Sequence, residues 1–509
     1  MYKAKRITIK QLLNKIHKGK RILCFGAGGR LNEFIAGYAK ENLEQYIEYI
    51  FDNNEKIWDS CKEINGIRIP IVNPLRLREI YSDKYIVLIT MSHSQEVIEQ
   101  IINCIGKKIV CYDTPVIGTW TSGPIEIYIK VIDWISKHLP LKNIMVFGGW
   151  GNSQRENEAT LRDYFIENGY SKKYKIVWLS DTVVDEVEKV KNGYYVLNRT
   201  MMETYNTLSE VWYRYNVMNR AKYLFFENHT MRKARKGQKC IYLNHGVPPI
   251  KQTKHTIKLP EDTDVCVCSS SRISHIVSEQ YNINKDKLLY SGSPRFDHLF
   301  LEERYIDKFI CGKEFCKVVV WVPTFRQHNI QLSRKDSDRV YACGVPFIEK
   351  ASDFDIINQR LEELNVCLMI KPHPLQDLSY IKVNKMTNIV LLLQEDLDKE
   401  GIGVNCVIKD ADAMITDYST IAFDYMLLDK PIGYTIDDME EYNVGFSTDS
   451  PLDWMPGRHM KNMDDMLGFI ADVCDGVDEK REDRNKVRDI VHENKGRGNS
   501  EELVWKLGL

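Results

Sequence analysis

The sequence lacks a long apolar run. None of its stretches approaches the ~20 apolar residues that a membrane-spanning helix needs. The longest candidates, such as Val318–Val322 and Ile389–Leu393, have the length of buried strands. The basic N-terminus also lacks the apolar core of a signal peptide. The sequence therefore predicts a soluble, cytoplasmic protein.

The sequence also has little that would define a metal or redox site. Its 13 cysteines are scattered, with no CxxC pair and no Cys/His quartet at zinc spacing. Cys266 and Cys268 would suit a redox pair, but alternation on a strand also explains them, and we expect reduced thiols. An excess of one charge is missing too, because 70 Lys and Arg stand against 71 Asp and Glu. That balance excludes a wholesale polyanion binder, and we expect no nucleic-acid partner.

What the sequence does contain is a regular alternation of short apolar strands and amphipathic helices. A chain of 509 residues exceeds the ~250–300 residues at which single cores stop growing. The alternation predicts an α/β fold with two Rossmann-like domains facing across a cleft, preceded by a third, small Rossmann-like domain. The predicted parts are the small domain at 1–118, a connecting helix at 119–140, and the paired domains at 141–310 and 311–509, with the last helix crossing back.

A glycine-rich turn stands near the N-terminus. Gly26–Gly29 follows the predicted strand Arg21–Phe25, and Asp52 ends the next predicted strand, Ile47–Phe51. This arrangement resembles a dinucleotide fingerprint in which the acid binds a ribose hydroxyl. The third glycine of GxGxxG would fall on Leu31, however. Two interpretations stay open: a dinucleotide site, and a tight turn that recognises something else or nothing.

Chemically useful side chains cluster where predicted strands of the paired domains end. Parallel strands bring their carboxyl ends to one edge of a sheet, where ligands bind in such folds. The five motifs are Tyr242–Lys251 (YLNHGVPPIK), Ser291–Asp297 (SGSPRFD), Trp321–Arg326 (WVPTFR), Leu368–Pro374 (LMIKPHP) and Met414–Asp424 (MITDYSTIAFD).

Four of these side chains suit proton transfer or phosphate binding. His245 is suited to accept a hydroxyl proton near neutral pH. Arg295 offers a planar fork that matches phosphate. Lys371 and His373 are two donors in a loop stiffened by prolines, which suits a diphosphate. Each also has a structural explanation: a loop histidine, a turn arginine or a solvated loop.

The last motif leads a strand into a helix. Ser419 and Thr420 stand at its start, where free N–H groups and hydroxyls meet an anion. Asp417 or Ser419 is the expected N-cap, and capping alone is the structural explanation. For Arg326 that explanation is a pair with a carboxylate. Together the motifs predict a site for a nucleotide diphosphate or another phosphorylated substrate.

In this order the motifs HGxPxxK, SGSPRxD, VPTFR, KPHP and TDYSTxxFD resemble the CDP-glycerol glycerophosphotransferase family of teichoic-acid and capsule polymer transferases. The resemblance runs from about Lys142 to the C-terminus. It implies a GT-B fold with CDP held mainly by the C-terminal domain. It also implies transfer of a polyol phosphate, with glycerol phosphate as the first choice, to an acceptor hydroxyl with release of CMP.

The resemblance further implies CDP-glycerol or CDP-ribitol as donor and a phosphorylated or glycan polymer as acceptor. No obligatory cofactor is expected, and free Mg²⁺ would assist without a protein-bound site. The oligomeric state stays open. The residues implied as catalytic are His245, His373 and Arg295. Those implied as substrate-binding are Lys251, Thr324, Arg326, Lys371, Asp417, Ser419, Thr420 and Asp424. Asn244 stands where the family usually has Trp, so we expect a different acceptor surface.

Three other functions stay open. The first is a GT-B glycosyltransferase with a nucleotide-sugar donor. The second is a binding protein whose GT-B half is degenerate. The third is an NAD-linked oxidoreductase centred on Gly26–Gly29.

Two further segments carry alternatives. Nine Lys and Arg precede Glu33, around a predicted helix with Ile9, Leu12, Leu13 and Ile16 on one face. That helix would either rest on anionic lipid at the inner face of the membrane or pack on its own domain. Asp410-Ala411-Asp412 mimics a metal-binding DxD motif, but a solvated helix end explains it as well.

Overall fold

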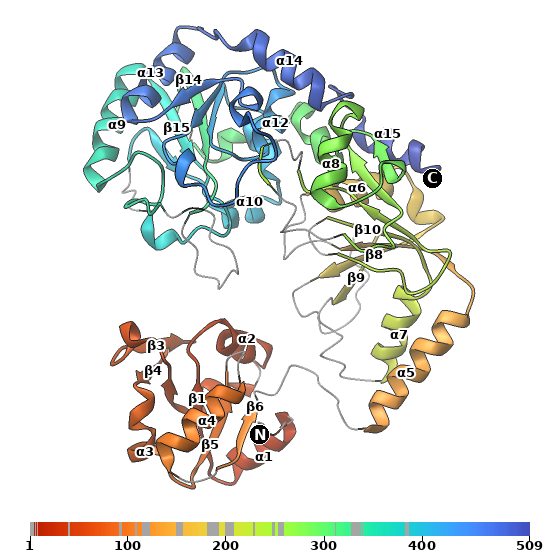
Figure 1. The fold of residues 1–509 in the computed structure, drawn as a ribbon, viewed down its shortest axis with the longest axis vertical. Helices are drawn as coiled ribbons and strands as arrows, with labels where there is room; N and C mark the ends of the chain where they lie inside the picture. The colour runs from red at the N-terminus through yellow and green to blue at the C-terminus, as the bar shows by residue number, and fades with distance from the viewer. Residues whose placement is uncertain are drawn as a thin grey trace. The chain divides into compact units, whose positions relative to one another are not determined.

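A computed structural model describes most of the chain (Figure 1). The described residues are 5, 7, 9–38, 41–90, 94–106, 109–113, 123–148, 156–180, 193–198, 208–227, 230–246, 250–252, 259–310, 312–326, 337, 339–381 and 386–509. They form two compact units. The first comprises Met1–Ser136 and Asn198–Asn216, and the second comprises Lys137–Leu197 and Val217–Leu509.

The first unit is built on a six-stranded sheet in the order β3-β4-β2-β1-β5-β6. Its pairs are parallel except for the β3–β4 hairpin. The strands are β1 (Arg21–Phe25), β2 (Ile47–Phe51), β3 (Cys61–Ile64), β4 (Ile67–Val72), β5 (Tyr85–Ile89) and β6 (Cys111–Asp113). The helices of this part are α1 (Ile9–His17), α2 (Gly29–Gly37), α3 (Leu77–Ile80), α4 (Ser94–Ile105) and α5 (Gly123–His138).

Helix α1 packs on the sheet of its own unit. Leu12 and Ile16 are 0% and 5% exposed, and Ile9 and Leu13 border the same core. The apolar face that would have met a lipid surface is therefore covered by protein, as the second alternative for this helix predicts.

The glycine-rich turn after β1 is braced by the first unit itself. Asp52 Oδ2 accepts a hydrogen bond from the Ala27 N–H at 2.7 Å, and Oδ1 accepts one from Asn54 at 2.9 Å. Lys62 of β3 donates to the Ala27 carbonyl at 2.6 Å. Because the acid that would bind a ribose holds the loop instead, this geometry favours the tight-turn interpretation over a dinucleotide site.

The second unit begins with a seven-stranded sheet in the order β13-β12-β11-β10-β7-β8-β9. Its pairs from β13 to β8 are parallel. The strands are β7 (Lys142–Gly148), β8 (Lys175–Ser180), β9 (Tyr195–Asn198), β10 (Ala221–Phe226), β11 (Lys239–Tyr242), β12 (Val265–Cys268) and β13 (Leu288–Tyr290). The helices of this stretch are α6 (Asn157–Glu167) and α8 (Ser274–Tyr281), whereas α7 (Leu208–Met218) belongs mostly to the first unit.

A third sheet, also in the second unit, is parallel throughout, in the order β16-β15-β14-β17-β18-β19. Helices α9 and α13 share a core on one face of it (Figure 1). The strands are β14 (Lys317–Val322), β15 (Val366–Ile370), β16 (Ile389–Leu391), β17 (Ala413–Thr416), β18 (Ile432–Thr435) and β19 (Arg458–Met460). The helices are α9 (Ala351–Leu364), α10 (Gln394–Glu400), α11 (Val404–Ile408), α12 (Ile421–Met426) and α13 (Met463–Cys474).

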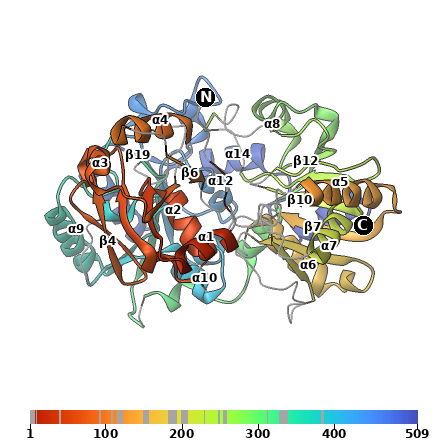
Figure 2. The ribbon, with the colours of Figure 1, turned by 90° about the horizontal axis from the view of Figure 1, so that it is seen from below.

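The last two helices, α14 (Arg481–Val491) and α15 (Asn499–Leu507), run from the third sheet back to the second. Helix α14 contacts both α12 and the 3₁₀ turn η7 (Ser271–Ile273), and Figure 2 shows it between the two halves of this unit. Helix α15 buries Leu503, Val504 and Leu507 in the core of the second sheet. The two sheets are therefore joined by C-terminal helices.

The predicted fold class is confirmed: three mostly parallel α/β sheets, of which the last two form a GT-B-like pair. The strands β3, β4 and β19 were not predicted. Across the described ranges, no helix is both long and apolar enough to cross a bilayer.

Candidate active site

The strand-end motifs of the second and third sheets surround a cavity of about 190 Å³ within the second unit. Most of the residues predicted for the site line this cavity, and so do Glu156 and Asn405, which were not predicted. The predicted residues at the cavity are His245, Arg295, Lys371, His373, Ser419, Thr420 and Asp424.

His245 follows β11 and pairs with a carboxylate that the sequence analysis missed. Its Nδ1 lies 3.0 Å from Oε1 of Glu227, the residue directly after β10. The Glu227 side chain is fully buried, whereas 48% of the His245 side chain is exposed. Desolvation lowers the pKa of His245, but the hydrogen bond and charge of Glu227 outweigh it and hold that pKa above its usual value. Glu227 therefore favours the protonated, positively charged form of the His245 ring.

Glu227 is held by the start of α6. Its Oε2 accepts from the Asn157 backbone N–H at 3.1 Å, and its Oε1 accepts from Asn157 Nδ2 at 3.0 Å. Burial raises the pKa of Glu227, yet the hydrogen bond and charge of His245, together with the charge of Arg295, bring that pKa below its usual value. Glu227 is thus an ionised carboxylate inside the protein.

Asn244 shapes the loop that carries His245. Its φ of +63° lies in the left-handed region, which Asn tolerates better than most residues. Its side chain is turned inward, accepting from Tyr281 at 2.9 Å and donating to the Val267 carbonyl at 3.2 Å. Asn244 is only 5% exposed, so its own side chain forms little of any surface, and the different acceptor surface stays a prediction.

Arg295 ties the His245 loop to the third sheet. Its fork binds both carboxylate oxygens of Asp424 on α12, at 2.8 and 3.0 Å. Its Nη1 also donates to the His245 carbonyl at 2.6 Å. Both partners of the ion pair are almost fully buried. The predicted catalytic role of Arg295 stays a prediction, and the geometry gives it a holding role.

Lys371 and His373 follow β15 and face the cavity with different charges. Burial lowers the pKa of Lys371 to about 8, and its amino group donates to the Pro372 carbonyl and to Gln394, both at 3.1 Å. His373 Nδ1 accepts from the Leu375 N–H at 3.1 Å. Burial, with the charges of Lys251 and Lys371, lowers its pKa to about 3. His373 is therefore neutral, with its proton on Nε2.

Ser419 and Thr420 lie where the third sheet meets the His245 loop. A Cβ on Gly246 would come within 2.6 Å of Thr420 Oγ1, so only glycine fits there without a shift. The N-cap of α12 is Thr420. The expectation of Asp417 or Ser419 at this position is wrong, because the chain enters α12 later than the sequence suggested.

Thr324, Arg326 and Asp417 do not line the cavity. Arg326 is buried against Asp438, with contacts of 2.7 and 3.1 Å, and against Asp417 at 3.1 Å. Asp417 also accepts from the Thr324 N–H at 3.0 Å. This is the arginine–carboxylate pair given above as the structural explanation. A direct contact of these three with substrate stays a prediction.

Lys251 lies on a short bridge between the two halves of the second unit. It pairs with Phe446 in an isolated antiparallel β-bridge, and Gln252 donates to the Gly445 carbonyl at 3.1 Å. Its charge reaches the cavity, since it contributes to the low pKa of His373. Its predicted contact with substrate stays a prediction.

The Asp410-Ala411-Asp412 sequence is structural. Asp410 accepts from the N–H groups of Tyr305 and Ile306 at 2.5 and 3.1 Å, and Asp412 accepts from Val318 at 2.8 Å. The Asp410 side chain is 7% exposed. The expectation of a solvated helix end is therefore wrong for Asp410, because this carboxylate ties loops together.

In the part of the chain that the structure describes, one group of three side chains has metal-ligand spacing. Oxygens of Glu156 and Glu227 and a ring nitrogen of His245 all lie within 4.8 Å of one another. Burial, with the charge of Glu227, raises the pKa of Glu156. The prediction that no protein-bound metal is needed stays a prediction.

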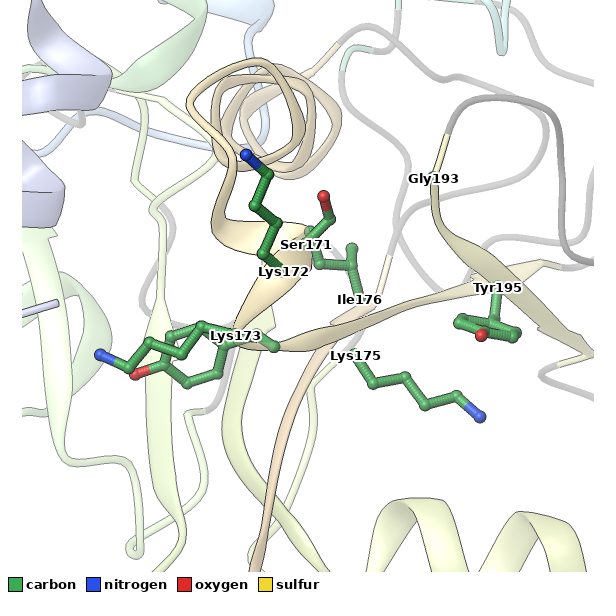
Figure 3. A pocket seen from close by; sticks show the side chains of 8 residues that line it. Ser171, Lys172, Lys173, Lys175, Ile176, Gly193 and Tyr195 are labelled. Carbon is green, nitrogen blue, oxygen red and sulfur yellow. The ribbon is translucent and has the colours of Figure 1, made fainter.

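A second hollow in the same unit carries three lysines at the amino end of β8. Figure 3 shows the amino groups of Lys172, Lys173 and Lys175 pointing in different directions. The amino group of Lys175 lies 4.0 Å from the centre of the Tyr195 ring. Because the charges diverge, this hollow does not form an anion site like the cavity at the strand ends.

Comparison with known proteins relates most of the chain to one family. Residues 132–507 match the family described as CDP-glycerol:poly(glycerophosphate) glycerophosphotransferase. A teichoic acid glycerol-phosphate transferase of Staphylococcus aureus (strain NCTC 8325 / PS 47) is 23% identical over 68% of this chain and 88% of its own. A teichoic acid glycerol-phosphate primase of Bacillus subtilis (strain 168) is 24% identical over 46% of this chain. The match spans 60% of that relative, which is less than two thirds of its length.

The fold has solved counterparts. The wall teichoic acid polymerase TagF superposes with a TM-score of 0.54 at 15% identity, covering 74% of this chain and 91% of its own. At this identity the likeness concerns the fold. The family match, in contrast, covers most of the chain, so the chain belongs to the CDP-glycerol:poly(glycerophosphate) glycerophosphotransferase family.

Proposed function

We propose that the protein transfers a polyol phosphate from a CDP-polyol to an acceptor hydroxyl and releases CMP, in the synthesis of a teichoic-acid-like or capsular polymer. Glycerol phosphate is the first choice of transferred group. The observation that carries the proposal is the cavity that gathers His245, Lys371 and His373 at the ends of two sheets.

In this reaction the acceptor oxygen attacks the β-phosphorus of the CDP-polyol. A new phosphodiester bond forms, the bond from that phosphorus to the bridging oxygen breaks, and CMP leaves. The hydroxyl proton passes to Nε2 of His245. Phosphoryl transfer asks the protein for positioning and charge stabilisation more than for covalent chemistry.

The described residues divide these tasks. Lys371 supplies positive charge from a buried position, and neutral His373 supplies an Nε2–H donor, so both suit phosphoryl oxygens. Arg295 binds the His245 carbonyl and Asp424, which fixes the loop that carries the base to α12. Ser419 and Thr420 offer hydroxyls at the same wall.

The test is CMP release from CDP-glycerol and from CDP-ribitol, with phosphorylated and glycan acceptors. Replacement His245→Ala should lower the turnover number by at least ~10²-fold, the usual contribution of a general base. His275→Ala is the matched control, because His275 is an exposed histidine on α8. Turnover that survives His245→Ala would refute the base assignment. A wild-type protein that turns over neither donor, but does turn over a nucleotide-sugar, would replace the proposal with the glycosyltransferase alternative.

A further inference from the structure

We propose that Glu227 is the positioning residue for His245: it holds the imidazole with its proton on Nδ1 and leaves Nε2 free to take the acceptor proton. The inference rests on the proposed function, because it concerns the group that accepts the proton in that reaction. Glu227 lies outside the five strand-end motifs and directly follows β10.

The hydrogen-bond geometry fixes the tautomer. An ionised carboxylate can only accept hydrogen bonds. The 3.0 Å contact between Glu227 Oε1 and His245 Nδ1 therefore requires a proton on Nδ1. Nε2 of the neutral ring then carries a lone pair. His245 lines the cavity and is half exposed, so that nitrogen is available to a hydroxyl.

Both oxygens of Glu227 are needed. Asn157 donates to each of them, from its backbone N–H and from Nδ2. The amide of Asn157 is itself oriented, because its Oδ1 accepts from the Arg295 N–H at 3.1 Å. A glutamine at 227 has one oxygen and one NH₂, so it would set an N–H against an N–H donor whichever way it turned.

The charged groups around His245 determine its pKa, so the proposal predicts how the reaction rate depends on pH. The groups acting on it are Glu227 after β10, Glu156 before α6, and Arg295 in the 3₁₀ helix η9 (Pro294–Phe300). The two carboxylates raise the pKa of His245, and Arg295 lowers it. His373, on the loop after β15, is kept neutral in part by the charge of His245. Neutral His245, the base, therefore accumulates only as pH rises through an elevated pKa.

Removing the Glu227 charge should shift this dependence to lower pH. The variant Glu227→Gln keeps the size of the side chain and loses the carboxylate. We expect its turnover number to fall by about 10²-fold or more, with the KM for the CDP-polyol changed less than about threefold. The acid limb of the pH–rate profile should move to lower pH. In the His245→Ala background the same substitution should add little, because the two residues act as one unit.

The matched control is Asp410→Asn. Asp410 is also a nearly buried carboxylate that accepts two backbone N–H groups, but outside the cavity. The Asp410→Asn substitution should lower the stability of the protein and leave the pH–rate profile unchanged. Ring-nitrogen NMR of ¹⁵N-histidine protein, with His245 assigned by its loss in His245→Ala, reads the tautomer and the pKa directly. Wild type should carry the proton on Nδ1, and Glu227→Gln should have the lower pKa.

Three results would overturn the proposal. The first is a neutral His245 with its proton on Nε2 in the wild type. The second is a Glu227→Gln variant with an unmoved pH–rate profile and a loss of stability like that of Asp410→Asn. The third is selective broadening of the His245 signals by Mn²⁺, with CMP release lost to a chelator. That result would mean that Glu156, Glu227 and His245 hold a cation. The NMR comparison needs no substrate, so it tests the pairing even if neither donor turns over.

Discussion

At the scale of single residues, Lys371 is a buried cation that would gain from a bound anion. Its hydrogen-bond partners are a carbonyl and an amide oxygen. Its pKa lies near 8 because burial outweighs the charges of Glu156 and Asp398. A buried cation without a carboxylate in hydrogen-bond contact is costly, and a diphosphate in the cavity would supply the missing negative charge.

The affinity for CDP should therefore depend on pH in a defined direction. Below the Lys371 pKa of about 8 the amine is already charged and affinity stays level. Above it, binding must first recover the proton, and affinity falls by up to about tenfold per pH unit. Lys371→Met should weaken binding below that pH and flatten the dependence above it. Calorimetric titration with CDP checks this, with Lys173→Met as the control; an unchanged wild-type affinity one unit above the pKa would contradict it.

His373 is expected to act without titrating. Its pKa of about 3 and the bond from Leu375 to Nδ1 keep the ring neutral. The variant His373→Gln, which replaces Nε2–H by an amide N–H, should retain more activity than His373→Ala. Both His373 variants should keep the wild-type midpoint of the acid limb of the pH–rate profile, because the pKa of His245 sets that midpoint. Rate profiles of the two variants against pH check this expectation, and a midpoint that moves in both would assign the limb to His373 instead.

The sequence predicted some site residues and missed others for a physical reason. His245, Lys371 and His373 were found because they stand in loops whose glycine or prolines draw attention to a strand end. Glu227 also follows a buried strand directly, so the same rule would have found it. Its partner Asn157 lies 70 positions away in the chain, and no local pattern indicates that contact.

At the scale of secondary-structure elements, the Arg295–Asp424 pair joins η9 to α12. Asp424→Asn would leave the buried Arg295 with less compensating charge, and breaking a buried pair in this way costs about 3–5 kcal/mol. Asp472→Asn is the control: its pair with Arg458 is 38–42% exposed, where such pairs contribute about 0–1 kcal/mol. Urea unfolding compares the two variants. Equal losses of stability would mean that Arg295 finds another partner.

Two of the strands missed by the sequence analysis, β3 and β19, are short and partly polar, whereas β4 (IRIPIV) has six mostly apolar residues. Strand β19 has three residues, two of them exposed, so it carries no apolar pattern. The β3–β4 hairpin alternates buried and exposed positions only in part. Its Asn65-Gly66 turn has φ values of +49° and +79°, the conformation that Asn-Gly favours in tight hairpins. The Asn65-Gly66 dipeptide is therefore the feature of the sequence that could have predicted the β3–β4 hairpin.

At the scale of the whole molecule, the second unit is closed by residues from the end of the chain. Helix α15 contributes Leu503, Val504 and Leu507 to the core of the second sheet. Gly292 makes room for this helix, because a Cβ there would overlap Asn499. The sequence analysis predicted that the last helix crosses back, but the strand rhythm does not identify which residues near 500 enter a core whose strands lie between 142 and 290.

This closure has a measurable consequence. Leu503 is 0% exposed and Trp505 on the same helix is 76% exposed. Leu503→Ala should therefore destabilise the unit by about 2–5 kcal/mol, whereas Trp505→Ala should change stability by less than about 0.5 kcal/mol. If α15 and α14 couple the two sheets, Leu503→Ala should also lower the urea concentration at which CDP binding is lost, although Leu503 lies outside the cavity lining. The contrary result is a Leu503→Ala variant that loses CDP binding at the same urea concentration as the wild type. If its second sheet alone unfolds earlier, the two sheets unfold independently.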